Sequence, residues 1–458
     1  MKPVLLTDFG STYTKLTAVD VDTAELLGTA AAYTTVQTDI NEGFAKALCA
    51  LEEKTGKLDY AESYACSSAA GGLRMMASGL VPELTLEAAR MASLGAGAKL
   101  IGQFSFELTE DDLDAIRAQK PDIFLLAGGT DGGNTSCILH NARMLASLKP
   151  DFPIIVAGNR TAARECMRIL SDCHARLCEN VMPRFGVLKT EQTQAAIRDI
   201  FLGRIIQAKG LDKAARMMND ILMPTPAAVL SALELLSGGC ESESGIGELC
   251  CVDVGGATTD VYSICEGMPK QMNLVYKGLP EPYAKRTVEG DIGMRYSVLG
   301  ILEAAGARKL AQLSGLTPER VEELCRMLSQ HTDLVPQSAD DELAALDFAL
   351  AAMAVQTATR RHAGTIEETY TMLGPTFVQS GKDLSAVRRI VATGGSLIHS
   401  AHVRQIAAFA AYDPADPGSL RPKDAEVLVD ESYILAAMGL LSTHYPEAAL
   451  QIMKRKIR

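Results

Sequence analysis

The eight residues Asp-Val-Gly-Gly-Ala-Thr-Thr-Asp at positions 253–260 follow a short apolar stretch and lead directly into another one. The same form occurs 245 residues earlier, where positions 8–15 read Asp-Phe-Gly-Ser-Thr-Tyr-Thr-Lys between two apolar stretches. Both segments follow the pattern Asp-x-Gly-small-x-x-Thr, and we call them arm one (8–15) and arm two (253–260). A unit that recurs in distant halves of a chain indicates a duplicated fold.

Each arm has the chemistry of a phosphate-binding turn. The Asp ends a strand, where its carboxylate can hold the water shell of Mg²⁺. The glycines and small residues that follow allow a tight turn whose backbone N–H groups bind phosphate oxygens. We therefore predict that Asp8 and Asp253 are catalytic and hold Mg²⁺ through water. The predicted nucleotide contacts of the two arms are Gly10, Ser11, Thr12, Tyr13, Lys15, Gly255, Gly256, Ala257, Thr258 and Thr259.

A third segment, 389–398, reads as a strand, a pair of glycines and the start of a helix, with Ser396 as its predicted N-cap. Paired glycines allow the close approach of a flat ring such as adenine. The same pattern also occurs in ordinary strand-to-helix turns. If the glycine pair binds adenine, then Gly394, Gly395 and Ser396 contact the adenosine of a bound nucleotide.

Composition excludes several classes of protein. The 458 residues carry 44 basic and 56 acidic side chains, a net charge of −12, which argues against broad nucleic-acid binding. No export signal is evident, and no apolar stretch reaches the ~20 residues that span a bilayer, so we expect a soluble, cytoplasmic protein. The cysteines include no Cys-x-x-Cys pair, and the cluster at 166–178 lacks zinc-ribbon spacing, so buried thiols are the expectation.

The pattern of strands and helices predicts an α/β protein with several parts. We predict a first ribonuclease-H-like domain at 1–85, completed by helices near 222–240 and 430–446, and a second one at 246–429 with a helical insertion. Alternating short strands and helices at 86–185 predict an inserted parallel α/β domain. Residues 186–245 are predicted to be a helical connector, and the pattern over 298–373 is helical.

The ordered set of two arms and a later glycine pair resembles the actin, heat-shock-70 and sugar-kinase ATPase superfamily. That resemblance implies two ribonuclease-H-like domains around a nucleotide cleft, with ATP and Mg²⁺ as cofactors. It also implies two small-residue helices that cross at a hinge. The segments at 225–232 and 430–439 are the candidates for these helices.

Over its whole length the chain resembles the MutL-type accessory proteins of adenosylcobalamin-dependent glutamate (methylaspartate) mutase, which are unrelated to the mismatch-repair protein of similar name. This resemblance implies an Mg²⁺-dependent ATPase that serves a protein partner, a reactivating chaperone that exchanges damaged cobalamin on mutase subunits for intact cofactor. The segments that carry the resemblance are 7–15, 65–73, 125–134, 288–297 and 430–440.

Two other functions remain open at this point, as does an actin-like filament. A small-molecule kinase would need a catalytic Asp beside an acceptor pocket, and a radical-dehydratase activator would need cysteine ligands for an iron–sulfur cluster. The glycine loop at 125–134 could bind a phosphate, a cobalamin tail or a partner, or only turn the chain. Glu289 and Asp291 could reach the nucleotide or cap the helix that follows them.

Overall fold

The chain folds into two compact units, which are described separately here. The computed structural model describes residues 1–10, 13–33, 40–67, 73–208, 220–269, 274–338, 341–371 and 374–458. Unit 1 comprises Met1–Val229 with Gly278–Pro280, and unit 2 comprises Leu230–Lys277 with Glu281–Arg458. None of the helices in these ranges is long and apolar enough to cross a membrane.

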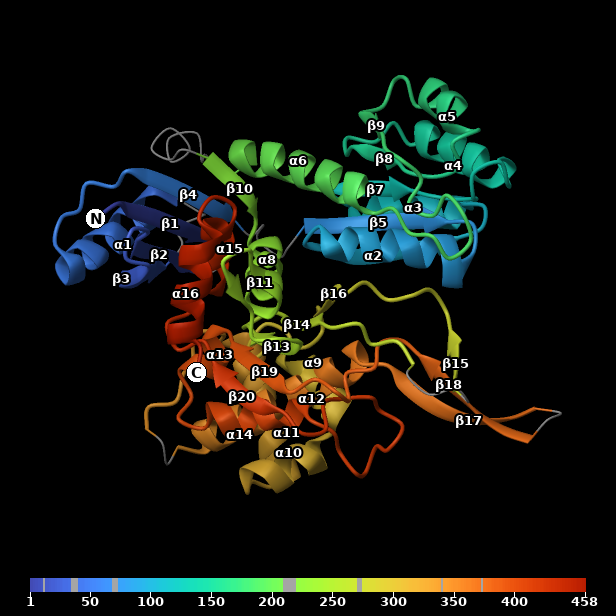
Figure 1. Cartoon of the computed structure of the whole chain (residues 1–458). Coiled ribbons are helices and arrows are strands. Elements are labelled where there is room, and N and C mark those ends of the chain that lie inside the picture. Colours follow the sequence, from blue (N-terminus) through green and yellow to red (C-terminus); the bar gives the residue numbers. More distant parts are fainter. Residues whose placement is uncertain are drawn as a thin grey trace. The chain divides into compact units, whose positions relative to one another are not determined.

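Unit 1 begins with a five-stranded mixed sheet of order β10-β4-β1-β2-β3 (Figure 1). Strands β1, β2 and β3 form an antiparallel meander, β4 runs parallel to β1, and β10 runs parallel to β4. Every residue of β1 is buried, as expected of an apolar central strand. Helix α1 covers one face with Phe44, Ala47 and Leu51. The elements are β1 (Pro3–Phe9), β2 (Tyr13–Asp20), β3 (Glu25–Tyr33), α1 (Ile40–Thr55), β4 (Glu62–Ser67) and β10 (Asp220–Pro224).

A second sheet in unit 1 is fully parallel, with the order β6-β5-β7-β8-β9. Numbered along the chain this is 2-1-3-4-5, a doubly wound arrangement. The strands stay parallel, but the order in which the chain adds them changes side between β5 and β7. Alternate strand residues pack with α2 and α6 on one face and with α3, α4 and α5 on the other. The elements are β5 (Leu73–Gly79), η1 (Pro82–Leu86), α2 (Glu87–Gly95), β6 (Ala98–Ser105), α3 (Glu110–Gln119), β7 (Ile123–Leu126), α4 (Ser136–Ser147), β8 (Ile154–Val156), α5 (Ala163–Ile169), β9 (Ala175–Leu177) and α6 (Glu191–Ala208).

Unit 2 contains a sheet of order β16-β14-β13-β19-β20. Strands β13, β14 and β16 form an antiparallel meander, while β19 and β20 run parallel to β13. The first sheet of unit 1 has the same order and the same strand directions. The predicted duplication of a ribonuclease-H-like fold, with an α/β insertion, is therefore confirmed. The strands are β13 (Leu249–Val254), β14 (Thr259–Ile264), β16 (Ala284–Glu289), β19 (Arg389–Thr393) and β20 (Glu426–Val429).

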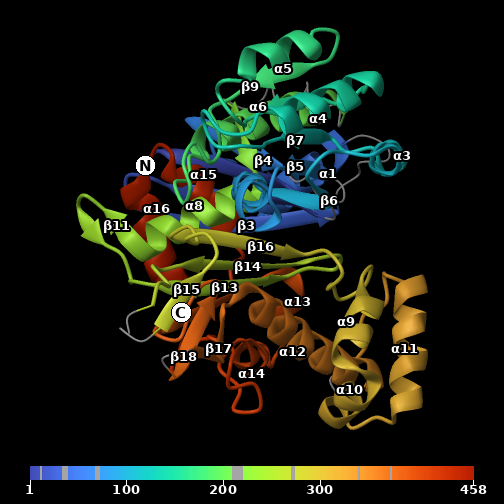
Figure 2. The same ribbon diagram turned by 90° about the vertical axis from the view of Figure 1, so that its right-hand side faces the viewer.

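Helices and two small sheets complete unit 2. Helix α12 packs its buried residues against β13, β14 and β16, and Figure 2 shows α9, α10 and α11 grouped beside it. The helices are α9 (Val298–Ala305), α10 (Ala307–Ser314), α11 (Pro318–Gln330), α12 (Glu342–His362), α13 (Gly395–Ile398), α14 (Val403–Ala407), η2 (Ala408–Ala410), α15 (Leu435–Ser442) and α16 (Pro446–Lys456), while α8 (Thr225–Gly238) crosses the division between the units. The small sheets contain β11 (Gly239–Cys240), β12 (Glu243–Ser244), β15 (Leu274–Lys277), β17 (Thr365–Thr371) and β18 (Gly374–Ser380).

Several segments differ from the sequence-based expectation. Strand β5 belongs to the parallel sheet, which therefore begins at Leu73 and not at residue 86. Strand β10 lies within the stretch that was predicted to be a helical connector, and β17 lies within the predicted helical stretch 298–373. Residues 430–446, which were expected to complete the first domain, belong to unit 2. In each case pairing with a distant strand or packing decides the outcome, and local periodicity does not report it.

Candidate functional site

Arm one is a tight hairpin turn between β1 and β2. Phe9 and Thr14 form the last cross-strand pair, and the Gly10 N–H donates to the Tyr13 carbonyl at 3.1 Å. A Cβ at Gly10 would lie 2.5 Å from that oxygen, so only glycine fits here without a shift. The Tyr13 ring is half exposed and meets Tyr33 edge to face at 5.9 Å. The predicted contacts Ser11 and Thr12 lie outside the described residues.

Asp8 is held by donors from three separate segments of unit 1. Its side chain is nearly buried; Oδ1 accepts from Thr225 Oγ1 at 2.6 Å and from Cys66 Sγ at 3.5 Å. The other oxygen pairs with Lys15 Nζ at 3.3 Å. Burial, and to a lesser degree the Asp8 charge, raises the pKa of the Cys66 thiol well above its usual value, so the thiol keeps its proton and can donate it. Lys15, one of the predicted nucleotide contacts, thus lies beside the carboxylate.

Arm two repeats this geometry in unit 2. Val254 and Thr259 form the last cross-strand pair, and the Gly255 N–H donates to the Thr258 carbonyl at 2.9 Å. The cross-strand partner of Asp253 is Asp260, as Lys15 is the partner of Asp8. The repeat in sequence is therefore a repeat in register as well.

Residues 290–297, which we call the bracing loop, pack against one side of arm two. The backbone N–H of Met294 donates to the Gly255 carbonyl at 3.1 Å, and those of Arg295 and Tyr296 donate to the Gly256 carbonyl at 2.8 and 2.9 Å. The hydroxyl of Ser297 donates to the Ala257 carbonyl at 2.7 Å, and Gly293 lies so close to Ala257 that a Cβ has no room.

These bonds orient the peptide groups of arm two. In a trans peptide the C=O and the following N–H point in opposite directions. Since the carbonyls of Gly255, Gly256 and Ala257 face the bracing loop, the N–H groups of the next three residues face the other side. Successive N–H groups with a common direction form an anion-binding nest. Arm two thus fits a phosphate group.

The charged and hydroxyl side chains of arm two have distinct surroundings. Asp253 is partly buried, and Asp260 pairs with the buried Arg286 at 2.8 Å to Nε and 2.6 Å to Nη2. The hydroxyl of Thr258 approaches Asp260 at 3.5 Å. Thr259 is fully buried, and its hydroxyl donates to the Ile292 carbonyl at 3.0 Å. In this structure the Thr259 side chain therefore holds the bracing loop.

The glycine pair after β19 lies directly beside arm two. Gly394 has a φ of +96°, and a Cβ there would lie 2.5 Å from Asp253 Oδ1 and 2.6 Å from Val254 N. At Gly395 a Cβ would meet no atom within 4 Å, and a contact between this residue and an adenine ring remains a prediction. The predicted N-cap at Ser396 is wrong, because the helix begins at Gly395 with Gly394 as its cap, and Ser396 lies inside the first turn.

Glu289, just before the bracing loop, and Asp291, within it, share one arginine. Arg361 Nη1 donates to Glu289 Oε2 at 2.7 Å and to Asp291 Oδ1 at 2.9 Å. Burial raises the pKa of Glu289, and Arg361 opposes that shift. Both carboxylates thus tie the loop to the end of α12.

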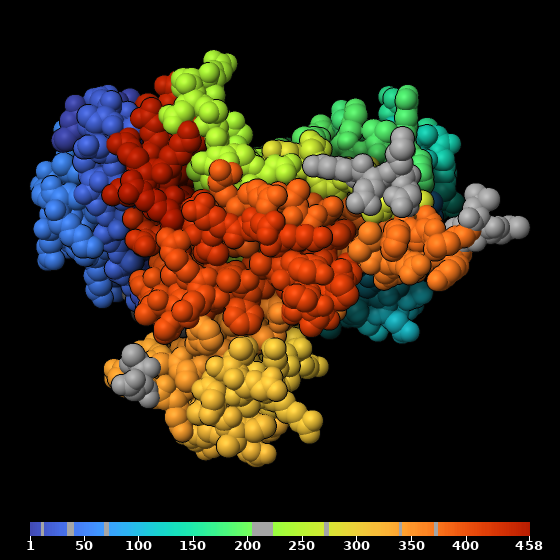
Figure 3. All heavy atoms as spheres, turned by 60° about the horizontal axis from the view of Figure 1, so that its bottom comes forward, coloured from blue at the N-terminus to red at the C-terminus, as the bar shows by residue number. Residues whose placement is uncertain are grey.

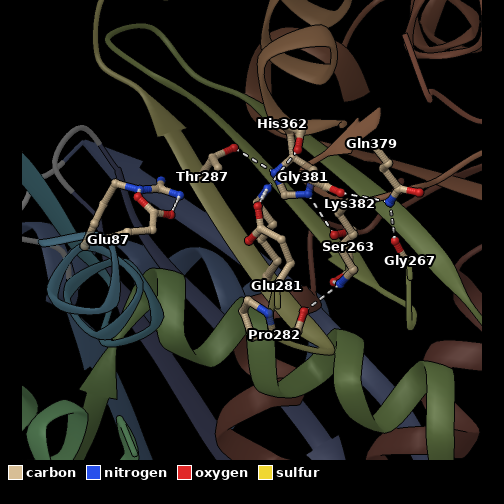
Figure 4. A network of polar contacts seen from close by, with 12 residues as sticks. Glu87, Ser263, Gly267, Glu281, Pro282, Thr287, His362, Gln379, Gly381 and Lys382 are labelled. Atoms are coloured by element: carbon tan, nitrogen blue, oxygen red, sulfur yellow. Dashed lines mark hydrogen bonds and ion pairs between the residues drawn. The ribbon is translucent and has the colours of Figure 1, made fainter. Parts of the chain in front are cut away.

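A buried network of polar side chains joins β14, β16 and α12, as Figure 4 shows. His362 Nδ1 and Nε2 each lie 2.8 Å from a hydroxyl, that of Thr287 on β16 and that of Ser263 on β14. Lys382 is fully buried and donates to the carbonyls of Pro282, Tyr283 and Ser263 at 2.8, 2.6 and 3.3 Å. Burial lowers the pKa of Lys382 to about 8. The network anchors α12 and the end of β18 to the sheet.

The glycine loop at 125–134 begins at the carboxyl end of β7, next to the point where the strand order of the parallel sheet changes side. The buried Asn159 accepts from Gly132 N at 3.2 Å and donates to the carbonyls of Gly133 and Asn134 at 3.0 Å. Asn180 donates to the Gly129 carbonyl at 3.0 Å. These contacts show a loop that is held in one shape by the ends of β8 and β9.

Within the described ranges, no group of three or more His, Cys, Asp or Glu side chains is arranged to hold a metal ion. The eleven cysteines are all free. Burial raises the pKa of Cys250 to about 12, so this thiol stays protonated. Mg²⁺ held through water by Asp8 and Asp253 remains a prediction.

Several residues that contact the arms from other segments were missed by sequence analysis. Thr225 and Cys66 bind Asp8 from 217 and 58 residues away, and Arg286 pairs with Asp260 from a neighbouring strand. In the sequence analysis the bracing loop appears as part of segment 288–297, which carries the resemblance to the MutL-type accessory proteins, and its contact with arm two was not predicted. No local pattern reports these contacts, since each depends on strands that pair over long distances in sequence.

Similar solved structures were found at low sequence identity. One is a diol dehydratase-reactivating factor in nucleotide-free form, 11% identical over 98% of this chain and 100% of that chain, with a TM-score of 0.39. Another is a ligand-bound xylulose kinase from Lactobacillus acidophilus, 13% identical over 100% and 92%, with a TM-score of 0.36. A third is the activator of the 2-hydroxyisocaproyl-CoA dehydratase from Clostridium difficile with bound ADPNP, 8% identical over 100% and 98%, with a TM-score of 0.33.

Sequence comparison gives a much stronger match. A family model described as MutL protein matches residues 4–457. The chain is also 46% identical over 459 residues to the protein named MutL from Clostridium tetanomorphum, with 99% of both chains covered. The chain belongs to the MutL protein family.

Proposed function

We propose that this protein is an Mg²⁺-dependent ATPase that reactivates a cobalamin-dependent mutase, with glutamate (methylaspartate) mutase as the partner. In this role ATP hydrolysis drives the exchange of damaged cobalamin on the mutase for intact cofactor. The mutase partner comes from the resemblance of the chain to the MutL-type accessory proteins. The ATPase activity rests on the residues of the two arms.

One observation carries the ATPase proposal. Both units contain the same hairpin turn, with an Asp at the same strand position and a glycine N–H closing the turn onto the carbonyl three residues later. In arm two, the carbonyls are occupied by the bracing loop and the N–H groups face the opposite side. An anion nest beside a carboxylate suits a polyphosphate and its cation.

The chemistry of such a site requires positioning and charge stabilisation without a covalent intermediate. Mg²⁺ bound with the nucleotide would neutralise phosphate charge and hold the attacking water. Asp253 would orient that water, and the N–H groups of arm two would hold phosphate oxygens. Loss of the γ-phosphate would remove a contact that both arms share, and the units could then open about a hinge and pull on the mutase.

The first test measures ATP turnover by the purified chain. Replacing Asp253 with alanine should lower turnover by at least about 100-fold, because charge stabilisation and water positioning both depend on this carboxylate. Asp424→Ala is the matched control, since Asp424 is an exposed carboxylate of the same unit that pairs only with Arg388 in the described contacts. Wild-type turnover by the Asp253→Ala protein would refute the assignment.

The second test concerns the partner. Mutase that has been inactivated by damaged cofactor is mixed with the chain, intact cobalamin, and either ATP or ADP, and its activity is followed. Recovery of mutase activity in the mixture with ATP, and not in the mixture with ADP, supports the proposal. Hydrolysis that proceeds without any small-molecule acceptor separates the ATPase from a kinase, because a kinase needs its acceptor for phosphoryl transfer. ATP hydrolysis without recovery of any mutase would leave the partner assignment refuted and the ATPase standing.

A further inference from the structure

The bracing loop is fixed to helix α12 by an ion pair that is largely shielded from solvent. The guanidinium of Arg295 makes two parallel bonds to Asp347, 2.9 Å from Nη1 to Oδ1 and 2.7 Å from Nη2 to Oδ2. The two side chains are only 13% and 21% exposed. Bidentate pairs of this kind fix orientation as well as distance.

The other hydrogen bonds of Arg295 also serve the loop. Its Nε donates to the Leu334 carbonyl at 3.0 Å, and its Nη1 donates to the Met294 carbonyl at 2.8 Å. Its backbone N–H is one of the donors to Gly256 in arm two. One residue therefore connects arm two, the segment before α12, and α12 itself.

Helix α12 is in turn held against the sheet that carries arm two. At its C-terminal end, His362 contacts hydroxyls of β14 and β16 (Figure 4), and Arg361 pairs with Glu289 and Asp291. At its N-terminal end, Asp347 receives Arg295. The bracing loop is thus attached to both ends of one rigid helix.

The helices that follow the bracing loop begin directly on it. Helix α9 starts at Val298, one residue after Ser297, whose hydroxyl binds arm two. Gly300 in its first turn lies so close to the Asp291 carbonyl that a Cβ has no room. Figure 3 shows the side chains of α9–α11 gathered in a yellow projection at the surface of the unit. A shift of the bracing loop would therefore move these helices as well.

We propose that the Arg295–Asp347 ion pair positions arm two for phosphate binding and couples phosphate occupancy there to the helical segment α9–α12. The inference deepens the proposed function, because it states how the nucleotide state of arm two would be transmitted to a surface of the same unit. Arg295 and Asp347 act through the bracing loop and are positioning residues. They touch neither the nucleotide nor the reacting water.

The test compares Arg295→Met and Asp347→Asn with Arg320→Met. Arg320 pairs with Glu323 and Glu342 in the same helical segment, and no contact to the bracing loop is found for it among the described residues, so Arg320→Met is a matched control. Affinities for adenosine, ADP and a non-hydrolysable ATP analogue are measured by calorimetry. We expect about tenfold weaker binding of the ATP analogue by the first two variants, with adenosine affinity within twofold of the wild type. Arg295→Lys keeps the charge but loses the paired bonds. Its affinity for the ATP analogue should therefore lie between those of Arg295→Met and the wild type.

Hydrogen exchange tests the positioning role without nucleotide and, in a second experiment with the ATP analogue, the coupling to α9. In Arg295→Met and Asp347→Asn, the amides of Gly255 and of 294–296, which donate hydrogen bonds in the structure, should exchange faster than in the wild type, while Arg320→Met should not change them. In the wild type, the ATP analogue should slow exchange in α9, and this effect should be lost in Asp347→Asn.

The outcomes separate the two proposals. Equal losses of adenosine and ATP-analogue affinity, or unchanged exchange at Gly255 and 294–296, would overturn the positioning role. A wild-type chain that binds none of the three nucleotides would refute the proposed function. In that case the exchange comparison between variants would still decide whether the ion pair holds arm two.

Discussion

Gly394 offers the sharpest test of how the glycine pair supports arm two. Replacing Gly394 with alanine introduces a Cβ that would lie 2.5 Å from both Asp253 Oδ1 and the Val254 carbonyl oxygen. The residue also has a φ of +96°, in a region that side-chain-bearing residues rarely adopt. The substitution therefore acts on backbone strain and on packing at once.

The magnitude follows from these two effects. A non-glycine residue in a sparsely populated backbone region costs of order 1–3 kcal/mol. Forcing an extra methyl group into a packed site costs about 1–3 kcal/mol more. We expect the free energy of unfolding to fall by about 2–6 kcal/mol, and ATP turnover to fall further than stability alone explains, because the carboxylate of Asp253 is the group displaced.

Gly395→Ala is the control that the chain itself supplies. Its Cβ would meet no atom within 4 Å, and its φ is not positive, so stability should change by less than about 0.5 kcal/mol. Urea unfolding followed by circular dichroism measures both variants. If an adenine ring lies over Gly395, this variant should also bind adenosine more weakly while its stability is unchanged. Equal stability of the Gly394→Ala and wild-type proteins would refute the reasoning.

Two further predictions concern buried polar contacts. Thr225→Val removes the hydroxyl that donates to Asp8 at 2.6 Å and should lower the free energy of unfolding by about 1–3 kcal/mol. Thr225→Ser keeps a hydroxyl and should retain most of the wild-type stability. Equal unfolding midpoints for the two variants would contradict this. Lys382 has its pKa lowered from 10.5 to about 8 in the fold, so between these values the unfolded chain binds the proton more tightly and stability should rise with pH. The wild type should therefore gain up to about 1.4 kcal/mol per pH unit over Lys382→Met between pH 8 and 10.5; a difference that stays constant with pH would show that Lys382 does not titrate there.

Local sequence predicts the arms because their chemistry is local. An Asp at a strand end, a glycine that closes a four-residue turn and a cross-strand partner seven residues later all lie within 8–15 or 253–260, and the structure has the same register in both. The strand β10 was not predicted in this way, since its residues were assigned to the helical connector 186–245 and form a strand by pairing with β4. Propensity is a weak guide wherever distant pairing decides.

The support of the arms depends even more on distant residues. Asp347 lies 52 residues from Arg295 and on a helix whose pattern reports only its buried face. The wrong N-cap at Ser396 has a related cause: the strand leads straight into the helix because Gly394 must lie against Asp253, so the turn has no room for a capping residue beyond it. Contacts of this kind follow from the fold and cannot be found before it.

The two arms share one backbone form and differ in charge. In arm one, the cross-strand partner of Asp8 is Lys15, which pairs with it, and both oxygens of Asp8 accept hydrogen bonds or ion pairs inside unit 1. In arm two, the corresponding partner of Asp253 is Asp260, whose charge is paired with Arg286. Arm two therefore contains two carboxylates, where arm one contains one carboxylate and one ammonium group. Since cations are drawn to the more negative site, Mg²⁺ and its water belong at arm two on the proposed function, and the lysine of arm one suits the phosphate charge.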